Sequence, residues 1–128
     1  MAIEGLNHVN LRAPAEQLRA LRDFYVEVVG LEDGSRPDFG VRGYWLYAGG
    51  QPIIHMMVCR EDGPAEVSAS HSPVDHIALT CSDLAATERR LEKLGTPYRK
   101  NDFSAERGFV QLFLLDPAGL GVELNFSA

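Results

Sequence analysis

Two short apolar segments of this chain carry a histidine at the same place: LNHVNL around His8 and VDHIAL around His76. A second pair of polar residues, His55 in PIIHMM and Glu123 in GVELNF, has the same separation, since 76 minus 8 and 123 minus 55 both give 68. Four side chains of metal-binding types therefore occupy matching positions in two halves of the chain. This spacing predicts a duplicated module with a polar site at its centre.

The chain has 128 residues, which is the usual size of one domain and too short for two independent hydrophobic cores. Two modules of this length are therefore expected to share a core. The formal net charge is −6, and the lysines and arginines form no stripe. We therefore expect no nucleic-acid partner and favour a small molecule or another protein.

The N-terminal residues MAIEGLNH contain neither the basic nor the apolar region of a signal peptide, and no apolar run is long enough to span a bilayer. We expect a cytoplasmic protein without a membrane partner. Cys59 and Cys81 are too few for a disulfide framework. They are predicted to be reduced, buried thiols at the ends of strands.

Apolar periodicity and turn residues predict the same order of elements, βαβββ, in both halves. The first helix should begin after Pro14 and end at Gly30, and the second should be capped by Asp83 and end at Gly95. The predicted strands are 6–12, 38–41, 43–48 and 53–59, then 74–81, 98–103, 108–115 and 121–126. The polar stretch 60–73 is predicted to be a linker, so that one domain, 1–128, contains module one at 1–59 and module two at 74–128.

We therefore predict an α+β fold in which two paired βαβββ modules form a curved, half-barrel-like mixed sheet around a cup. Side chains alternate between the two faces of a strand, so those in phase with the histidines should line the cup. These residues are His8, Asn10, His55, Met57, His76, Ala78, Glu123 and Asn125. On the penultimate strand of each module, the residues expected to face the cup are Gln111 and Phe113, with Tyr44, Leu46 and Ala48 as their first-half equivalents.

The matching places of His8, His55, His76 and Glu123 predict a divalent transition-metal site in the cup. Imidazoles and a carboxylate can hold such an ion and leave coordination positions open for a substrate. Any one of the four alone is typical of a hydrogen-bonded core residue or a solvated surface residue. The prediction comes from their joint occurrence.

The candidate substrate contacts are polar or aromatic residues on the same face. Arg12, four residues past His8, could receive a substrate carboxylate at the rim or could be a solvated strand end. Asn10, Gln111 and Phe113 could contact the substrate or simply pack as wall residues.

Four segments resemble the vicinal oxygen chelate superfamily: LNHVNLR, DFYVEVVGL, VDHIAL and QLFLLDPAGLGVEL. The resemblance covers nearly the whole chain and implies a metal held from the first and last strands of paired modules, by His8, His76 and Glu123 with His55 at the fourth place. A substrate with neighbouring oxygens then chelates the ion. Many short members complete each cup across a subunit interface, which implies a homodimer.

The resemblance to extradiol dioxygenases provides the leading hypothesis for function. It implies Fe²⁺ held by His8, His76 and Glu123, with His55 as a non-ligating acid/base. Phe113 stands where those enzymes have a tyrosine, and the histidine that precedes that tyrosine has no counterpart here. The hydrogen bonds that those two side chains supply in the dioxygenases are therefore missing from the pattern.

Lactoylglutathione lyase is the alternative. The chain resembles it in H-x-x-x-R, carried by His8 and Arg12, and in the terminal D-P-x-G-x-x-x-E-L. This resemblance implies Ni²⁺, Zn²⁺ or Mn²⁺ on all four ligand residues, with Glu123 as the base. Bleomycin-resistance proteins, which bind a drug without metal and lack this ligand set, are the non-enzyme alternative.

Overall fold

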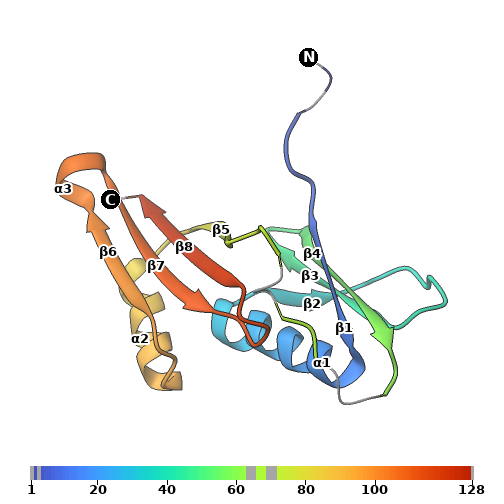
Figure 1. Cartoon of the computed structure of the whole chain (residues 1–128). Helices are drawn as coiled ribbons and strands as arrows, with labels where there is room; N and C mark the ends of the chain where they lie inside the picture. The colour runs from blue at the N-terminus through green and yellow to red at the C-terminus, as the bar shows by residue number, and fades with distance from the viewer. Residues whose placement is uncertain (1, 3, 63–65, 69–71, 128) are drawn as a thin grey trace. The chain divides into compact units, whose positions relative to one another are not determined.

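The computed structural model describes residues 2, 4–62, 66–68 and 72–127. The chain divides into two compact units, Met1–Val67 and Ser68–Ala128. Each unit contains one four-stranded sheet and one long helical segment (Figure 1). The predicted linker includes residues 63–65 and 69–71, which lie outside the described residues, and both the module boundaries and a shared core stay predictions.

The first unit has the element order β1 (Val9–Pro14), α1 (Ala15–Asp23), η1 (Phe24–Val29), β2 (Glu32–Gly34), β3 (Gly43–Ala48) and β4 (Gln51–Arg60). Its strand order is β1-β4-β3-β2, with β1 parallel to β4 and the other neighbours antiparallel. The helix begins after Pro14 as predicted, and its last turn, η1, is a π-helix that ends at Gly30 with φ of 100°. Glycine adopts this left-handed conformation without a steric penalty.

Burial alternates along the central strand of the first sheet. Ile54, Met56 and Val58 of β4 are buried, whereas His55 and Met57 between them are only partly buried. The helix α1 contacts β4 and buries Leu18 and Leu21, so one face of β4 belongs to the core. His55 and Met57 are left on the opposite face.

The second unit has the element order β5 (His76–Cys81), α2 (Leu84–Leu94), β6 (Arg99–Phe103), α3 (Ser104–Arg107), β7 (Phe109–Leu115) and β8 (Gly121–Ser127). Its strand order is β5-β8-β7-β6, again with the first and last strands parallel. Asp83 caps α2 by accepting a hydrogen bond from the Ala86 N–H at 3.0 Å, and the helix ends at Gly95. Both helix ends agree with the prediction.

The two sheets repeat the same register at the strands that carry the histidines. Asn10 pairs with His55 and Ala78 pairs with Glu123, so the partners are 45 residues apart in both sheets. The next ladder pairs Trp45 with His55 and, 68 residues later, Phe113 with Glu123. The predicted α+β fold with two βαβββ units is confirmed, as two four-stranded mixed sheets.

Several strand boundaries differ from the prediction. The second strand of the first unit is β2 (Glu32–Gly34), whereas the predicted strand 38–41 is wrong, because Gly40 has φ of 77° and its N–H donates to Asp38 Oδ1 in a turn. Strand β1 begins at Val9 and β5 at His76, later than predicted, so His8 immediately precedes its strand. Leu6 is 87% exposed and has no apolar surface to pack on.

Both cysteines are free thiols, but their burial differs from the prediction. Cys81 at the end of β5 is partly buried, whereas Cys59 near the end of β4 is exposed. Burial raises the pKa of the Cys81 thiol, which keeps it protonated and unreactive.

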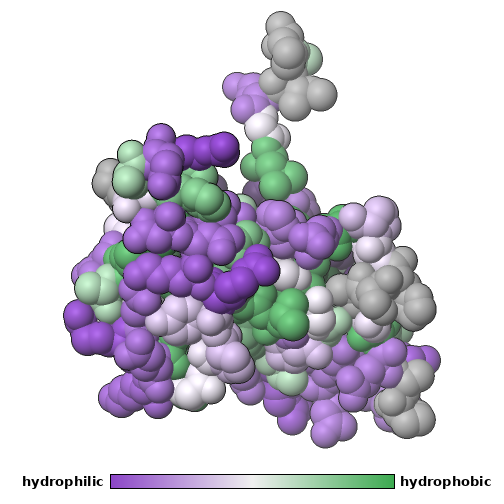
Figure 2. Space-filling view, turned by 60° about the vertical axis from the view of Figure 1, so that its left-hand side comes forward, coloured by the Kyte–Doolittle hydropathy of each residue, from purple (hydrophilic) through white to green (hydrophobic). Residues whose placement is uncertain are grey.

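The surface drawn in Figure 2 is mostly hydrophilic, with small separate apolar areas. None of the helices in the described part of the chain combines the length and apolarity needed to cross a membrane.

The turn between β7 and β8 offers a test of the second sheet. Asp116 is buried, and its Oδ1 accepts hydrogen bonds from the N–H groups of Ala118 at 2.8 Å and Leu120 at 2.9 Å. We predict that Asp116→Ala lowers the free energy of unfolding by about 1–3 kcal/mol, because two backbone donors lose their acceptor. Urea denaturation measures this loss. Asp116→Asn keeps an acceptor oxygen and should cost less, and equal losses for both variants would contradict the prediction.

Candidate functional site

In the second unit, His76 and Glu123 face each other across the parallel pair β5 and β8. His76 Nε2 lies 3.4 Å from Glu123 Oε1, and the Glu123 side chain is only 7% exposed. His76 is the first residue of β5, and Glu123 lies inside β8. Its neighbours Val122 and Leu124 are buried on one face of β8, so Glu123 on the opposite face would ordinarily be exposed to solvent. A buried carboxylate therefore has an imidazole as its neighbour.

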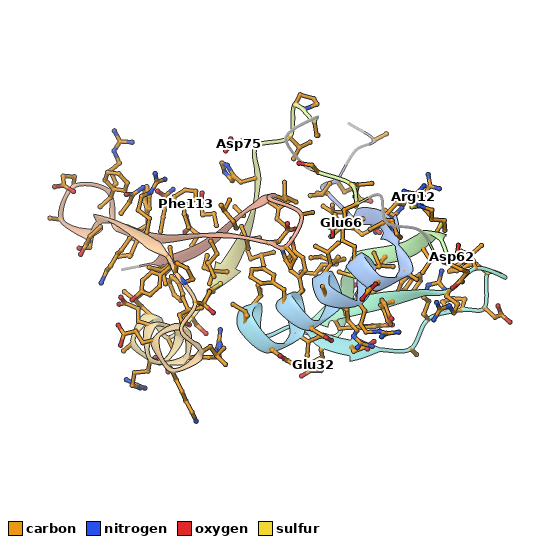
Figure 3. The ribbon with its side chains drawn as sticks, turned by 60° about the horizontal axis from the view of Figure 1, so that its bottom comes forward. Arg12, Glu32, Asp62, Glu66, Asp75 and Phe113 are labelled. Carbon is orange, nitrogen blue, oxygen red and sulfur yellow. The ribbon has the colours of Figure 1, made fainter. Side chains whose placement is uncertain are left out.

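Neighbouring polar groups orient both side chains. His76 Nδ1 lies 2.8 Å from Oδ2 of Asp75, a residue labelled in Figure 3, and because a carboxylate only accepts, Nδ1 carries a hydrogen. The Asn125 amide donates to Glu123 Oε2 at 2.9 Å. When His76 is neutral, the remaining Nε2 and Oε1 atoms both present lone pairs to each other. This approach is favourable when a cation lies between the two atoms, either a proton or a metal ion.

The separation of these two atoms fits a metal ion. An ion bound at about 2.1 Å by both atoms, with an angle of about 90–110° between the bonds, needs the atoms about 3.0–3.4 Å apart. The observed 3.4 Å between His76 Nε2 and Glu123 Oε1 lies at the upper end of this range. The pair can therefore supply two adjacent ligands to one ion without moving.

In the first unit, His8 and His55 stack. Their ring centroids are 3.7 Å apart at an interplanar angle of 14°, and His55 also stacks on Trp45 at 4.2 Å. His8 Nδ1 lies 2.7 Å from Asn7 Oδ1, which repeats the arrangement of Asp75 and His76 at the same 68-residue spacing. The hydrogen on Nδ1 of His8 leaves its Nε2 lone pair for another partner.

His55 differs from the other two histidines in the nitrogen that carries its hydrogen. Its Nε2 lies 3.1 Å from the Pro52 carbonyl, so Nε2 is the donor and Nδ1 holds the lone pair. Burial lowers the pKa of His55, and the nearby His8 and Arg36 lower it further, although the hydrogen bond to Pro52 acts in the opposite direction. His55 is therefore a neutral base near pH 7.

His8 and His55 both line a pocket of the first unit, and His76 lines a pocket of the second unit. The first pocket, of about 300 Å³, is lined by His8, Asn10, Arg36, Phe39, Trp45, His55, Met56 and Met57. The second, of about 580 Å³, includes Asp75, His76, Tyr98, Arg99 and Phe113 in its wall. Both pockets combine an aromatic surface with a histidine and an arginine, which suits a small polar or anionic ligand.

The candidate substrate residues lie as follows. Asn10 lines the first pocket, and Arg12, labelled in Figure 3, is exposed two residues further along β1. Phe113 pairs with Glu123 across the sheet and meets the His76 ring edge-on, with the centroids 5.7 Å apart. Gln111 is in phase with Phe113, and its Oε1 accepts a long hydrogen bond of 3.5 Å from the Asn101 amide.

The prediction that Tyr44 and Leu46 of β3 lie on the same face as His55 is wrong. Leu46 is fully buried in the core, and Tyr44 lies under the guanidinium of Arg22 on α1, so both point away from His55. Trp45 faces His55 instead. The prediction took Leu46 as the equivalent of Gln111, a spacing of 65 residues, whereas the ladders keep 68 and make Trp45 the equivalent of Phe113.

Sequence reasoning also missed Asn7, Asp75 and Arg36. The first two were detectable, because they precede the two histidines and are themselves 68 residues apart. Arg36 lies in an irregular loop that has no periodic pattern, so no signal pointed to it.

The ligand-type side chains come as two pairs, one in each unit. Within residues 2, 4–62, 66–68 and 72–127, no three His, Cys, Asp or Glu side chains gather closely enough to hold an ion by themselves. Each pair is two ligands short of a four-coordinate site.

A family model described as Glyoxalase/Bleomycin resistance protein/Dioxygenase superfamily matches residues 5–124. A relative from Arabidopsis thaliana, Glyoxylase I 4, is 30% identical over 129 residues, covering 95% of this chain and 70% of the relative. Among solved structures, a lactoylglutathione lyase from Agrobacterium tumefaciens has a TM-score of 0.66 at 21% identity, with 98% of this chain and 96% of that chain covered. TnmS3, an antibiotic-binding protein from Streptomyces sp. CB03234, has a TM-score of 0.62 at 21% identity, with 100% and 99% covered. These two structures share the fold.

The environment of His55 predicts a pH effect in the metal-free protein. We expect its NMR titration midpoint to lie below the ordinary value of 6.5, and to rise in Trp45→Leu, which removes part of the covering surface. Because the folded state then binds fewer protons than the unfolded state, stability should fall as pH decreases below about 6.5. His55→Gln assigns the resonance and should weaken this dependence. A midpoint at or above 6.5 would contradict the prediction.

Proposed function

Because the chain belongs to the Glyoxalase/Bleomycin resistance protein/Dioxygenase superfamily, we propose that it is a metal-dependent enzyme acting on a small substrate that chelates the ion through two neighbouring oxygens. The observation that carries this proposal is the approach of His76 Nε2 to Glu123 Oε1 at 3.4 Å. Hydrogen bonds hold the other nitrogen of His76 to Asp75 and the other oxygen of Glu123 to Asn125. A bound divalent ion would stabilise negative charge that develops on a substrate oxygen.

We assign His8, His76 and Glu123 as the metal ligands. Nδ1 of each of these histidines is already hydrogen-bonded to a side-chain oxygen, so both would bind through Nε2. Two imidazoles and one carboxylate leave positions for a chelating substrate. The assignment brings one ligand from the first unit together with two from the second, either within one chain or between the two chains of a homodimer.

His55 is assigned the proton transfer. It is neutral near pH 7, its hydrogen is held by the Pro52 carbonyl, and its Nδ1 lone pair can accept a proton from a bound substrate. Glu123 is less suited to this role, because Asn125 donates to one of its oxygens and His76 faces the other. His55 could also be the fourth metal ligand through Nδ1, but that lone pair would then no longer accept a proton.

These roles favour an isomerase or lyase of the lactoylglutathione type, in which a proton moves between adjacent carbons. The 30% identical relative carries a glyoxylase name, which supports the same class. Ring cleavage by an extradiol dioxygenase, the leading hypothesis from sequence, becomes the second candidate. The two-histidine, one-carboxylate set favours it, whereas Phe113 presents a ring edge without a hydroxyl beside His76.

Metal analysis and turnover assays separate the candidates. Nickel, zinc or manganese with isomerisation of a hemithioacetal supports the first, and iron with oxygen uptake on a catechol supports the second. A protein that binds no divalent ion and turns over neither substrate would instead be a small-molecule-binding protein, the class named for the structural neighbour TnmS3, an antibiotic-binding protein.

Loss of a ligand tests the metal site directly. We predict that His8→Ala, His76→Ala and Glu123→Ala each weaken binding of the retained metal by more than about 100-fold, measured by calorimetry, because each removes a bond to the ion. Glu106→Ala, at an exposed position on α3, is the matched control and should not change the affinity. Unchanged metal content in both His8→Ala and Glu123→Ala would refute the proposal.

A mixture of two variants that each lack a metal ligand tests whether one site takes its ligands from one chain or from two. If the ligands come from two chains, co-refolded His8→Ala and Glu123→Ala should recover metal binding at one of the two sites of a mixed dimer. If all ligands come from one chain, the mixture should bind no more metal than either variant alone.

The hydrogen bond from His76 to Asp75 should also affect the affinity. We predict that Asp75→Ala weakens metal binding by roughly 10- to 100-fold, whereas Asp75→Asn retains an acceptor and weakens it less. Equal affinities for wild type and Asp75→Ala would show that the hydrogen bond does not position the ligand.

A further inference from the structure

Arg36 lies in the loop between β2 and β3 and reaches the pocket that contains His8 and His55. Two contacts hold its side chain, and a glycine leaves room for it. The guanidinium carbon lies 4.9 Å from the centroid of the Phe39 ring, and Nη1 donates to the Val41 carbonyl at 2.9 Å. A Cβ at position 43 would lie 3.0 Å from that guanidinium carbon, so Gly43 leaves the space that the guanidinium occupies.

The hydrogen bonding of Arg36 is incomplete. Its Nε is the single buried side-chain nitrogen or oxygen without a hydrogen-bond partner in the described part of the chain. No carboxylate of the described residues forms an ion pair with Arg36. A guanidinium that is held in place, but is not neutralised by the protein, retains capacity for an anion from outside.

The surrounding pocket defines the shape of that anion. Trp45 and Phe39 supply flat aromatic surfaces, Asn10 supplies an amide, and the two histidines lie in the same wall. The volume of about 300 Å³ suits a small organic group. A carboxylate matches the planar fork of a guanidinium better than a spherical anion does.

We propose that Arg36 binds a carboxylate of the substrate, and that the substrate is therefore an organic acid whose neighbouring oxygens lie toward His8, the assigned metal ligand of this pocket. The orientation of the oxygens depends on the proposed metal-dependent function, whereas the carboxylate contact does not. Arg12 was the residue predicted for this role from sequence, but it is exposed on β1 and does not line this pocket among the described residues.

Trp45 is the single tryptophan of the chain and lies in this pocket, so its fluorescence reports binding there. The probes are catechol and 3,4-dihydroxybenzoate, which share two neighbouring oxygens and differ by one carboxylate. In the metal-loaded protein we expect 3,4-dihydroxybenzoate to bind roughly 10- to 100-fold more tightly than catechol, as for a charge-assisted contact. Arg36→Gln should abolish this difference by weakening the binding of 3,4-dihydroxybenzoate.

Two comparison variants make the result specific. Arg36→Lys keeps the charge without the planar fork and should retain part of the difference, while Arg12→Gln should retain all of it. Circular dichroism confirms that each variant is folded. If Arg36→Gln keeps the full preference for the carboxylate, or if Arg12→Gln removes it, the proposal is wrong.

Benzoate separates this proposal from the metal function, because it has a carboxylate and no neighbouring hydroxyls. In the metal-free protein, benzoate should quench Trp45, and Arg36→Gln should weaken that binding by the same roughly 10- to 100-fold. Such a result would support the Arg36 site even if the protein bound no metal. Equal benzoate binding by wild type and Arg36→Gln would refute the Arg36 site, whatever the metal content.

Discussion

The parallel pairing of the first and last strands in each sheet is the constraint on which the candidate site depends. A parallel ladder fixes which residues stand beside each other, and here it sets Asn10 beside His55 and Ala78 beside Glu123. A shift by one residue in either ladder would turn the polar side chain of the last strand into the apolar core. The duplicated polar side chains therefore occupy equivalent places in the two sheets because the backbone register is duplicated as well.

The sequence predicted the duplicated module and most of its secondary structure, because the residue spacing and the alternation of apolar residues directly reflect the geometry of strands and helices. The 68-residue separation, the βαβββ order and the helix ends at Gly30 and Gly95 all follow from local rules. The side of β3 that faces His55 did not follow, since the two halves contain loops of different length and the predicted equivalents of Gln111 and Phe113 were therefore out of phase. Only the ladder from Trp45 to His55 determines that phase.

The surroundings of the candidate ligands were harder to predict than the ligands themselves. Asn7 and Asp75 form hydrogen bonds with the histidines that follow them, yet both are exposed polar residues just before a strand, a place where such residues commonly have no role. Arg36 depends on a loop conformation that no periodic pattern encodes. Periodicity thus identifies which residues share a face, whereas hydrogen bonding and loop geometry decide which atoms of those residues remain available.

Gly43 connects the sheet with the loop that carries Arg36. A Cβ at this position would lie 2.0 Å from the backbone oxygen of Met56 on the paired strand and 3.0 Å from the Arg36 guanidinium. Any larger side chain would therefore disturb both the β3–β4 pairing and the cation at the pocket. A single glycine thus couples the strand pairing of the first sheet to the placement of the Arg36 guanidinium.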